Sequence, residues 1–378
     1  MNRLVIIGNG FDLVHGLKTS YNDFIDWYWG QRIYRLRLLH TKEDGDLLCK
    51  LSIKDNKDFS DWFNFFYQQY FFKDLLTDKK IHTNADIVLC FKEEPEYFSV
   101  ECSPLLERIM KNIETSGWAD IENDYYQLLK MTMNPECKFT INALNSQLLF
   151  LQEKLIEYLN TMDKDVYDSK LEDKIIEPFN PKDFSTEGKQ KAATDIEGKV
   201  SDIIDIKDEV HEPNKFIPKQ IMMLSFNYTN TAFNYGNFNM VYNYIHGGLT
   251  KPKYIIFGYG DELDKNYQNI LDTNDNEMLR YAKSVKYLES SNYRKMLQFI
   301  ESAPFQVYIF GHSCGNSDRT LLNTVFEHNN CMSIKPFYHK WNDQEDNYLD
   351  IVQNISRNFT DKKKFRDRVV NKTQCDTL

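Results

Sequence analysis

Short runs of consecutive apolar residues near the two ends of the chain are typical of buried strands. The first run, Leu4–Ile7, begins three residues into the chain and leads into two glycines, Gly8 and Gly10. Four consecutive apolar residues suit a strand that is buried on both faces of a parallel sheet. Similar runs in the carboxyl-terminal third predict further strands at Ile221–Phe226, Val241–Ile245, Tyr254–Phe257, Gln306–Phe310 and Met332–His339.

Between these runs, apolar residues recur at helical spacing. The pattern predicts helices that begin near Tyr21, at Pro104 and after Ser317, and helices over Ile141–Met162 and Asp346–Phe359. Thr19 or Ser20 is suited to cap the helix that begins near Tyr21. Ser317 is suited to cap the helix that begins directly after Ser317. The large apolar residues of Ile141–Met162 form a stripe that covers only two or three heptads, which indicates packing within the chain rather than a partner coil.

Strands at both ends with helices between them predict an α/β fold with a mostly parallel sheet and a large helical insertion. We expect residues 1–35 and 215–345 to form the core around a central first strand, 36–214 to be the insertion, and 346–378 to pack on the core as helices. Residues 163–200 are polar and lack a sustained apolar period, so they are interpreted as a linker or an exposed loop. Phe59–Leu76 is dense in aromatic residues, which indicates helix core because basic residues are not interleaved with the rings.

Composition limits the partners that we expect. The 378 residues include 56 acidic and 46 basic side chains, and the formal net charge of -10 gives nucleic acid little long-range attraction. The chain has no run of about 18 apolar residues and no leader pattern, so we expect a soluble, cytoplasmic protein without membrane contact. Seven scattered cysteines without a C-x-x-C motif indicate reduced thiols, and eight histidines without paired spacing argue against a zinc site.

Polar residues or glycines follow several of the predicted strands at once. The motifs are G-N-G-F-D at Gly8–Asp12, F-N-Y-T-N-T at Phe226–Thr231, I-H-G-G at Ile245–Gly248, F-G-Y-G-D at Phe257–Asp261 and F-G-H-S-C-G-N-S-D at Phe310–Asp318. In an open α/β sheet, ligands bind beyond the carboxyl ends of the strands. We therefore expect these five segments to converge on one crevice.

The G-N-G-F-D motif is the candidate nucleotide turn. Because Gly8 and Gly10 lack side chains, a phosphate or a ribose could approach the backbone closely at this turn. Asp12 is placed to accept a hydrogen bond from a sugar hydroxyl or from a loop amide. The motif lacks the third glycine of the dinucleotide fingerprint, and any tight turn after a strand would also use glycine.

Taken together, several of these motifs resemble those of a known family across nearly the whole chain. G-N-G-F-D, G-W-A-D-I-E at Gly117–Glu122, F-N-Y-T-N-T, I-H-G and F-G-H-S-x-G-x-S-D resemble the AbiH family of phage abortive-infection proteins. Their order also resembles the sirtuin-like domains of other bacterial defence proteins, which bind NAD and in many cases hydrolyse it. The resemblance implies a Rossmann-like core that binds NAD, a helical insertion, and a role in killing or arresting an infected cell.

The resemblance also implies roles for single residues. Asn227 matches the asparagine that holds the nicotinamide ribose, and His246 matches the histidine that faces its hydroxyls, so these two are the candidate catalytic residues. The candidate NAD-contacting residues are Gly8, Asn9, Gly10, Phe11, Asp12, Asn227, Tyr228, Gly311, His312, Ser313, Ser317 and Asp318. Asn9 and Phe11 stand where the sirtuin-like loop usually has alanine or serine, and Thr229 stands where aspartate is usual. We expect binding to survive these departures better than activity.

Cleavage of the nicotinamide N-glycosidic bond passes through an oxocarbenium-like centre, so the protein has to distort the ribose, stabilise positive charge and admit a water. His246 is suited to accept a proton from a ribose hydroxyl or from that water, and Asn227 is suited to orient either. The structural alternatives are that His246 bonds a neighbouring strand end and that Asn227 caps the turn after its strand. No metal is expected in this chemistry.

Two classes of function remain open from the sequence. The first is an effector that hydrolyses NAD, and the second is a non-catalytic nucleotide-binding sensor or interaction module. A nuclease is a weaker third, although Asp120 and Glu122 are available to one. Besides NAD or a related nucleotide, the candidate partners are a second copy of the chain and a phage-derived trigger protein.

Ser313 lacks the G-x-S-x-G spacing of a hydrolase nucleophile, and Cys314 is expected to be structural because no patterned basic residue accompanies it.

Overall fold

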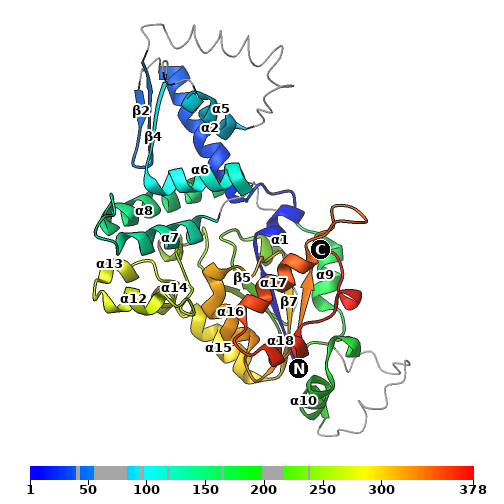
Figure 1. The fold of residues 1–378 in the computed structure, drawn as a ribbon. Helices are drawn as coiled ribbons and strands as arrows, with labels where there is room; N and C mark the ends of the chain where they lie inside the picture. Colours follow the sequence, from blue (N-terminus) through cyan, green and yellow to red (C-terminus); the bar gives the residue numbers. More distant parts are fainter. Residues whose placement is uncertain are drawn as a thin grey trace. The chain divides into compact units, whose positions relative to one another are not determined.

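The computed structural model describes residues 1–39, 43–54, 83–93, 95, 98–116, 120–162, 166–197, 217–236 and 239–378 (Figure 1). The chain divides into two compact units, which we call the sheet unit and the second unit. The sheet unit comprises Met1–Leu17, Met162–Asp275 and Leu279–Leu378, and the second unit comprises Lys18–Thr161 and Asn276–Met278. The first unit boundary therefore differs from the expected core boundary near residue 35.

A five-stranded parallel sheet forms the centre of the sheet unit. Its strands are β1 (Asn2–Ile7), β5 (Ile221–Ser225), β6 (Met240–Tyr244), β7 (Phe305–Phe310) and β8 (Cys331–Phe337), in the order β6-β5-β1-β7-β8. In the middle strand, Leu4 pairs with Met222 of β5 on one side and with Val307 of β7 on the other. The prediction of an α/β fold with a parallel sheet and a central first strand is confirmed.

Helices from several parts of the sequence belong to the sheet unit. They are α1 (Asn9–Val14), α9 (Ser169–Ile176), α10 (Thr186–Glu197), α12 (Tyr267–Asp272), α14 (Lys283–Lys286), α15 (Asn292–Ser302), α16 (Arg319–Phe326), α17 (Tyr348–Asn358) and α18 (Lys362–Arg368). Short 3-10 turns are η2 (Pro181–Asp183), η4 (Thr231–Asn234), η5 (Pro252–Tyr254), η6 (Tyr287–Glu289), η7 (Asn316–Asp318) and η8 (Lys372–Gln374). Helix α13 (Asn276–Leu279) crosses the division between the two units.

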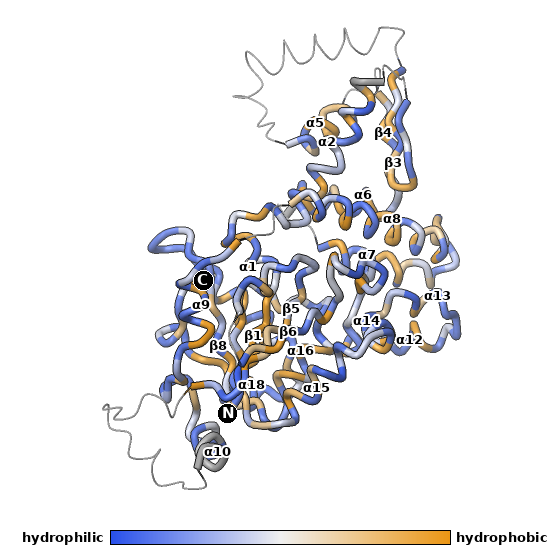
Figure 2. Tube along the Cα trace, turned by 180° about the vertical axis from the view of Figure 1, so that it is seen from behind, coloured by the Kyte–Doolittle hydropathy of each residue, from blue (hydrophilic) through white to orange (hydrophobic). Residues whose placement is uncertain are grey.

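The two faces of the sheet are buried in separate hydrophobic clusters. Leu4 and Ile6 belong to the cluster that includes residues of α15, α16 and α17, whereas Val5 and Ile7 belong to the cluster that includes residues of α9. All six residues of β1 are buried. This double burial explains why Leu4–Ile7, the last four residues of β1, are all apolar and do not alternate with polar residues. Figure 2 shows hydrophobic residues along the strands of this sheet.

The polar segment of residues 163–200 contains two helices where the sequence predicted a linker or loop. In α9, Leu171 and Ile175 are buried in the cluster on one face of the sheet. They lie one helical turn apart, and the Asp168 side chain caps the helix by accepting a hydrogen bond from the Lys170 backbone N–H. Two anchoring residues are too few to produce a sustained apolar period, so the sequence pattern did not reveal this helix.

Tyr254–Phe257 does not form the predicted strand. Gly247, with a φ of +79°, turns the chain after β6, and η5 follows. The three residues after η5 are buried, and the N–H of Ile256 donates to the His246 carbonyl at 2.8 Å. The apolar run indicated burial correctly. It did not specify pairing, because consecutive apolar residues do not by themselves provide a partner strand.

The second unit combines a small antiparallel sheet with helices. Its elements are α2 (Tyr21–Leu39), β2 (Glu43–Gly45), β3 (Cys49–Ile53), α5 (Asn84–Glu93), β4 (Phe98–Cys102), α6 (Pro104–Ser116), α7 (Ile121–Thr132) and α8 (Ile141–Leu159). Helix α2 begins where the sequence predicted, and the Ser20 hydroxyl accepts a hydrogen bond from the Asp23 N–H at 3.1 Å. The apolar stripe of α8 is buried, as predicted.

The aromatic segment Phe59–Leu76 lies outside the described residues. In the described parts of the chain, no helix combines the length and the hydropathy needed to cross a bilayer.

Candidate functional site

The segments that follow β1, β5 and β7 meet at the carboxyl edge of the parallel sheet. The N–H of Gly8 donates to the Phe310 carbonyl at 3.0 Å, and the N–H of Gly10 donates to the Gly311 carbonyl at 2.8 Å. From the end of β5, Nδ2 of Asn227 donates to the Gly8 carbonyl at 3.0 Å. The sequence predicted that these loops converge, because parallel strands all end at the same edge. The hydrogen bonds confirm that part of the prediction.

The glycines of G-N-G-F-D allow one backbone to pack against another. A Cβ atom on Gly8 would lie 2.5 Å from the Cα of His312, and a Cβ atom on Gly10 would lie 2.7 Å from the Cα of Gly311. Asn9 begins the short helix α1, so the motif is not an open loop. We expected the missing side chains of Gly8 and Gly10 to leave room for a phosphate, and this explanation is wrong for both glycines. The loop after β7 fills that space.

Asp12 lies in a buried group of hydroxyls. Its side chain is almost fully buried, and its Oδ2 accepts a hydrogen bond from the Thr229 hydroxyl at 2.6 Å. The Thr231 hydroxyl donates in turn to Thr229 at 3.2 Å. Burial raises the pKa of Asp12, while the hydrogen bond from Thr229 acts in the opposite direction. The Thr229 hydroxyl, from the segment after β5, thus supports a buried carboxylate that comes from α1.

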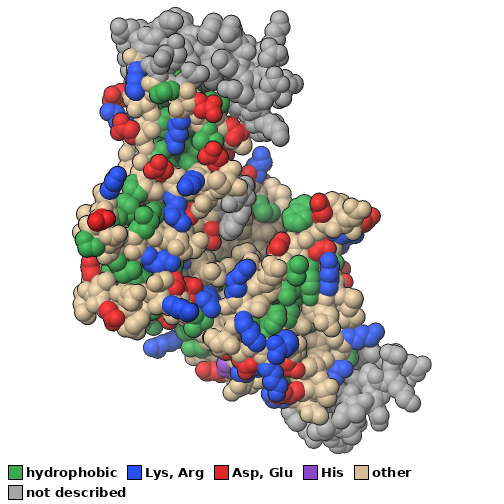
Figure 3. Space-filling model, in the orientation of Figure 1, with side chains coloured by type: hydrophobic (Ala, Val, Ile, Leu, Met, Phe, Trp, Pro, Cys, Tyr) green, Lys and Arg blue, Asp and Glu red, His purple; other side chains and the backbone are tan. Residues whose placement is uncertain are grey.

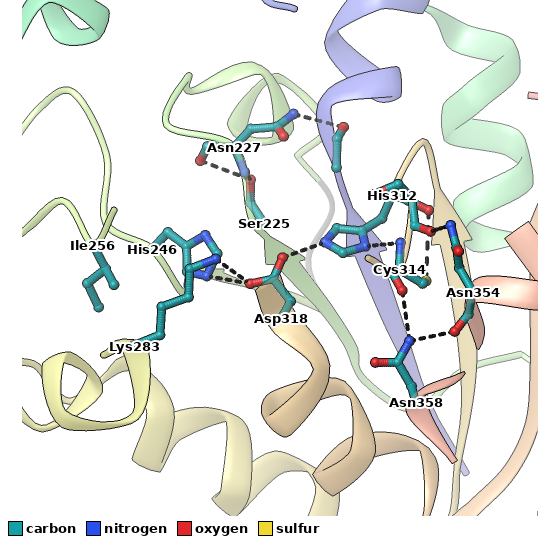
Figure 4. Close-up of polar contacts among 12 residues, drawn as sticks. Ser225, Asn227, His246, Ile256, Lys283, His312, Cys314, Asp318, Asn354 and Asn358 are labelled. Carbon is teal, nitrogen blue, oxygen red and sulfur yellow. Dashed lines mark hydrogen bonds and ion pairs between the residues drawn. The ribbon is translucent and has the colours of Figure 1, made fainter. Parts of the chain in front are cut away.

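A cluster of buried ionisable groups surrounds Asp318, just before α16 (Figure 4). Oδ1 of Asp318 accepts a hydrogen bond from Nζ of Lys283 at 2.8 Å and lies 3.2 Å from Nε2 of His246. Its Oδ2 lies 3.5 Å from Nε2 of His312. The side chain of Lys283 is 0% exposed and that of Asp318 is 9% exposed. Figure 4 shows the three basic side chains directed at one carboxylate from separate parts of the chain.

The F-G-Y-G-D segment supports this cluster although no strand precedes it. The N–H of Lys283 donates to the Tyr259 carbonyl at 2.7 Å, and the N–H of Tyr259 donates to the Tyr281 carbonyl at 3.1 Å. A Cβ atom on Gly260 would lie 2.6 Å from the carbonyl oxygen of Ser317. The segment thus positions Lys283 and the turn that carries Asp318, so it belongs to the convergent edge as predicted.

The contacts of the two histidines assign their protons. Asp318 is ionised, because the Lys283 ammonium and the histidines outweigh the cost of burial and hold the pKa of this carboxyl well below its usual value. Burial and the Lys283 ammonium lower the pKa of His246 to about 4. A neutral His246 that faces an ionised carboxylate through Nε2 carries its proton on that atom, so Nδ1 is the acceptor. In His312, Nδ1 accepts from the Cys314 N–H at 2.9 Å, which again places the proton on Nε2.

This proton assignment does not favour a metal at Asp318. A histidine that binds a metal through Nε2 normally donates a hydrogen bond from Nδ1, whereas Nδ1 of His312 is an acceptor. The Lys283 ammonium also occupies one side of the carboxylate. Among the described residues, no group of three or more His, Cys, Asp or Glu side chains is arranged to hold a metal ion.

The lowered pKa of His246 predicts a specific acid sensitivity. As the pH falls below 6.5, His246 takes up a proton in the unfolded chain but not in the folded protein, whose His246 has a pKa of about 4. Its contribution to stability is therefore complete above pH 6.5 and is lost as the pH falls to about 4, with a magnitude of about 3 kcal/mol. We expect urea unfolding to show this loss in the wild type relative to His246→Gln. Parallel pH profiles for the two proteins would contradict the neutral, buried assignment of His246.

The loop after β7 is held by α17. Nδ2 of Asn354 donates to the Ser313 carbonyl at 2.8 Å, and Nδ2 of Asn358 donates to the Cys314 carbonyl at the same distance. Cys314 is fully buried and has a φ of +55°, a conformation that is unfavourable for a residue with a side chain. Burial also raises the pKa of the Cys314 thiol. These observations support the interpretation of Cys314 as structural, since a thiol held in its protonated form is a poor nucleophile.

The remaining residues predicted from the sequence occupy different environments at this edge. Phe11 is buried against the rings of Tyr235 and Phe310, with centroids 5.3 and 6.4 Å away. The Tyr228 hydroxyl donates to the Ile256 carbonyl at 3.0 Å. Asn9 and Ser317 are half-buried, and Ser313 is exposed. Ser317 does not cap α16, because Asp318 occupies the cap position.

Sequence reasoning missed Lys283, Tyr287 and the two asparagines of α17. Lys283 is one of 46 basic residues and lies in Y-A-K-S, which carries no motif. The Tyr287 hydroxyl lies 3.1 Å from Nε2 of His246. Its position two residues after the buried Tyr281 is a weak sequence signal for Lys283, and only the tertiary structure brings Lys283 to Asp318.

Comparison with known proteins identifies a protein family. No curated protein and no solved structure matches the chain. The family described as "Bacteriophage abortive infection AbiH" matches residues 4–340, which include all five motif segments at the carboxyl edge. The chain belongs to the AbiH family of bacteriophage abortive-infection proteins.

Proposed function

We propose that this protein is an abortive-infection effector that binds NAD at the carboxyl edge of its sheet and hydrolyses the nicotinamide N-glycosidic bond. Membership of the AbiH family gives the protein its role in abortive infection. The observation that most supports the hydrolase proposal is the pairing of a neutral His246 with an ionised Asp318 at the edge where open α/β sheets bind ligands.

Two observations bear on whether NAD fits this edge. Oδ1 of the buried Asp12 has no hydrogen-bond partner among the described residues, although a buried carboxylate oxygen is normally satisfied. A ribose hydroxyl is a donor of the kind that such an oxygen accepts. Gly8 and Gly10 do not provide a cradle for a diphosphate, since the loop after β7 occupies the space beside them. We therefore assign the ribose to Asp12 and Asn227 and leave these two glycines a structural role.

The mechanism that follows depends on the orientation of His246. Its Nε2–H is directed at Asp318, so Nδ1 is the atom able to accept a hydrogen bond from a ribose hydroxyl or from the attacking water. An aspartate that fixes the tautomer of a histidine in this way is a recurrent arrangement in hydrolases. With a pKa of about 4, His246 stays neutral at physiological pH and acts as an acceptor without first losing a proton. Asn227 would orient the ribose through its amide oxygen, because its Nδ2 already donates a hydrogen bond to the Gly8 carbonyl.

Substitution of the two catalytic candidates tests the proposal. We expect His246→Ala and Asn227→Ala each to lower nicotinamide release from NAD by about 10²-fold or more, with a much smaller change in NAD affinity. The reason is that both side chains are assigned to stabilise the transition state more than bound NAD. Chromatography of nicotinamide measures turnover, and calorimetry measures affinity. Cys314→Ala is the control and should stay within a few-fold of wild type.

In infected cells, the wild type should lower NAD, and a His246→Ala variant expressed at the same level should neither lower NAD nor protect against phage. A variant that protects while NAD stays constant in both strains would show that NAD cleavage is not the defence mechanism.

The contacts of the same two residues also favour a second candidate, a non-catalytic nucleotide sensor. Nδ2 of Asn227 is bonded to the Gly8 carbonyl, and Nε2 of His246 is directed at Asp318. The His246 side chain thus bonds a neighbouring segment of the edge, as its structural alternative expected, whereas the Asn227 side chain bonds the segment after β1 instead of capping the turn after its own strand. A sensor would bind NAD or a related nucleotide without releasing nicotinamide, and a phage-derived protein or a second copy of the chain would then read the bound state.

Nucleic acid remains the least supported ligand. Binding to a phosphate backbone generally requires a basic surface of single sign. On the face shown in Figure 3, acidic and basic side chains are interspersed, and the net charge of the chain is -10.

A further inference from the structure

Two cysteines of the second unit lie directly opposite each other in neighbouring strands. Cys49 begins β3 and Cys102 ends β4, and the two residues are paired in the antiparallel register. Both are free thiols; Cys49 is buried and Cys102 is partly exposed. Because residues that face each other across a strand pair project to the same side of a sheet, the two thiols share one face.

The backbone hydrogen bonds show which type of pair this is. The Cys49 carbonyl accepts from the Asp46 N–H at 2.8 Å, and the Cys49 N–H donates to Oδ1 of Asp46 at 3.1 Å. Both polar groups of Cys49 are thus directed away from β4. At the next pair, the Ser103 N–H donates to the Leu48 carbonyl at 2.6 Å. Cys49 and Cys102 therefore form a pair without hydrogen bonds, the type in which Cα atoms are about 4.5 Å apart and side chains are closest.

We propose that Cys49 and Cys102 are a modification site, at which they form an intramolecular disulfide across β3 and β4 when an external disulfide accepts their two electrons. A Cα separation of about 4.5 Å lies within the range of protein disulfides, about 4.4–6.8 Å, so the strands need not move apart or together. The bond would enclose the chain from Cys49 to Cys102, including α5. This inference does not depend on NAD binding or cleavage.

The order of the two steps follows from exposure. Cys102 is the accessible thiol, so its thiolate attacks a small-molecule disulfide, forms a mixed disulfide and releases one small thiol. The Cys49 thiolate then attacks the sulfur of Cys102, which forms the cross-strand bond and releases the second small thiol. Each cysteine loses one proton and one electron, and the external disulfide is reduced to two thiols.

The surroundings make this reaction slow at neutral pH. Burial raises the pKa of Cys102 to about 11, although Lys92 acts in the opposite direction. Burial also raises the pKa of Cys49, while a contact with the Tyr28 hydroxyl, 3.2 Å from Sγ, and the Arg32 guanidinium lower it. We therefore expect the disulfide to form readily only at elevated pH or on prolonged exposure to the oxidant.

The test uses the reduced full-length protein and oxidised glutathione at about pH 8.5, near the pKa of an ordinary thiol. After acid quenching, alkylation and digestion, mass spectrometry should find the Cys49–Cys102 peptide as the main intramolecular product, and dithiothreitol should remove it. Cys49→Ser should leave Cys102 as a mixed disulfide with glutathione. Cys137→Ser is the matched control and should leave the cross-link unchanged.

Three results would overturn the proposal. The first is that Cys49 and Cys102 both stay open to alkylation under conditions in which Cys137 takes up glutathione. The second is that Cys102 pairs mainly with Cys90. The third is that the protein in urea gives the same distribution of products, because the strand register would then have no part in the reaction. Circular dichroism of each variant confirms that the fold is retained.

Discussion

Replacing Asp318 by asparagine is expected to destabilise the protein by about 3–5 kcal/mol, because the Lys283 ammonium would remain buried without a countercharge. Lys283 is 0% exposed, and its Nζ lies 2.8 Å from Oδ1 of Asp318. An ammonium in such a site either keeps its charge at high cost or loses its proton. Urea unfolding at pH 7 measures the change, and the wild type serves as reference.

Two control variants separate the cost of the unpaired charge from other effects. The double variant Asp318→Asn with Lys283→Met removes both charges and should recover most of the lost stability, because no unpaired charge remains. The pair Lys340–Asp343 has a similar separation, 2.7 Å, but its side chains are 41% and 98% exposed. Asp343→Asn should therefore leave the stability almost unchanged, because solvent screens an exposed pair. Equal losses of stability for Asp318→Asn and Asp343→Asn would show that burial does not determine the cost of breaking the ion pair.

Gly311→Ala should be the most damaging glycine substitution at the carboxyl edge, with a loss of more than about 4 kcal/mol. A Cβ atom at Gly311 would lie 2.2 Å from the N of Phe11 and 2.4 Å from the carbonyl carbon of Gly10. Both are backbone atoms, so no side-chain rotation relieves the overlap, and the loop after β7 would have to separate from α1. The variant would also hold alanine at a φ of +67°. Chemical denaturation measures the loss, or limited proteolysis if the protein does not accumulate.

Gly16 provides the matched control for this prediction. Its φ is +76°, close to that of Gly311, but a Cβ atom there would have nothing within 4 Å. Gly16→Ala should therefore cost only the left-handed conformation, about 1–2 kcal/mol. If the two alanine variants lose the same stability, backbone contact between α1 and the loop after β7 is not what fixes this edge.

The fold could be predicted from the sequence where burial acts on whole runs of residues. The central position and parallel pairing of β1 followed from Leu4–Ile7, because a strand covered on both faces has no polar alternation to maintain. The helices α2 and α8 followed from a capping residue and a long stripe. The apolar pattern wrongly predicted a strand at Tyr254–Phe257, because the burial of these residues does not involve strand pairing. It did not predict α9, because only two residues of that helix are buried.

The candidate site could be predicted only in part. The motifs at strand ends identified Asn227, His246 and Asp318, because parallel topology brings such ends to one edge. The sequence could not show that Asp318 and His246 are in contact, since 71 intervening residues separate positions 246 and 318. It also gave the wrong reason for Gly8 and Gly10, because the same residue type serves a ligand or a neighbouring backbone equally well.

The sequence by itself determined the elements whose cause is local: the apolar strands, the capped helices and the glycine and polar motifs at the strand ends. Those features depend on the period of side-chain burial and on backbone geometry, which neighbouring residues set. Only the tertiary structure decided which of the many charged residues are buried together. Lys283 reaches Asp318 because the Tyr259 carbonyl holds its backbone N–H. Burial, together with the Lys283 ammonium, then lowers the pKa of His246 and keeps this histidine neutral. Charge interactions in a buried site depend on distance and desolvation, and residues far apart in the sequence acquire both only when the chain folds.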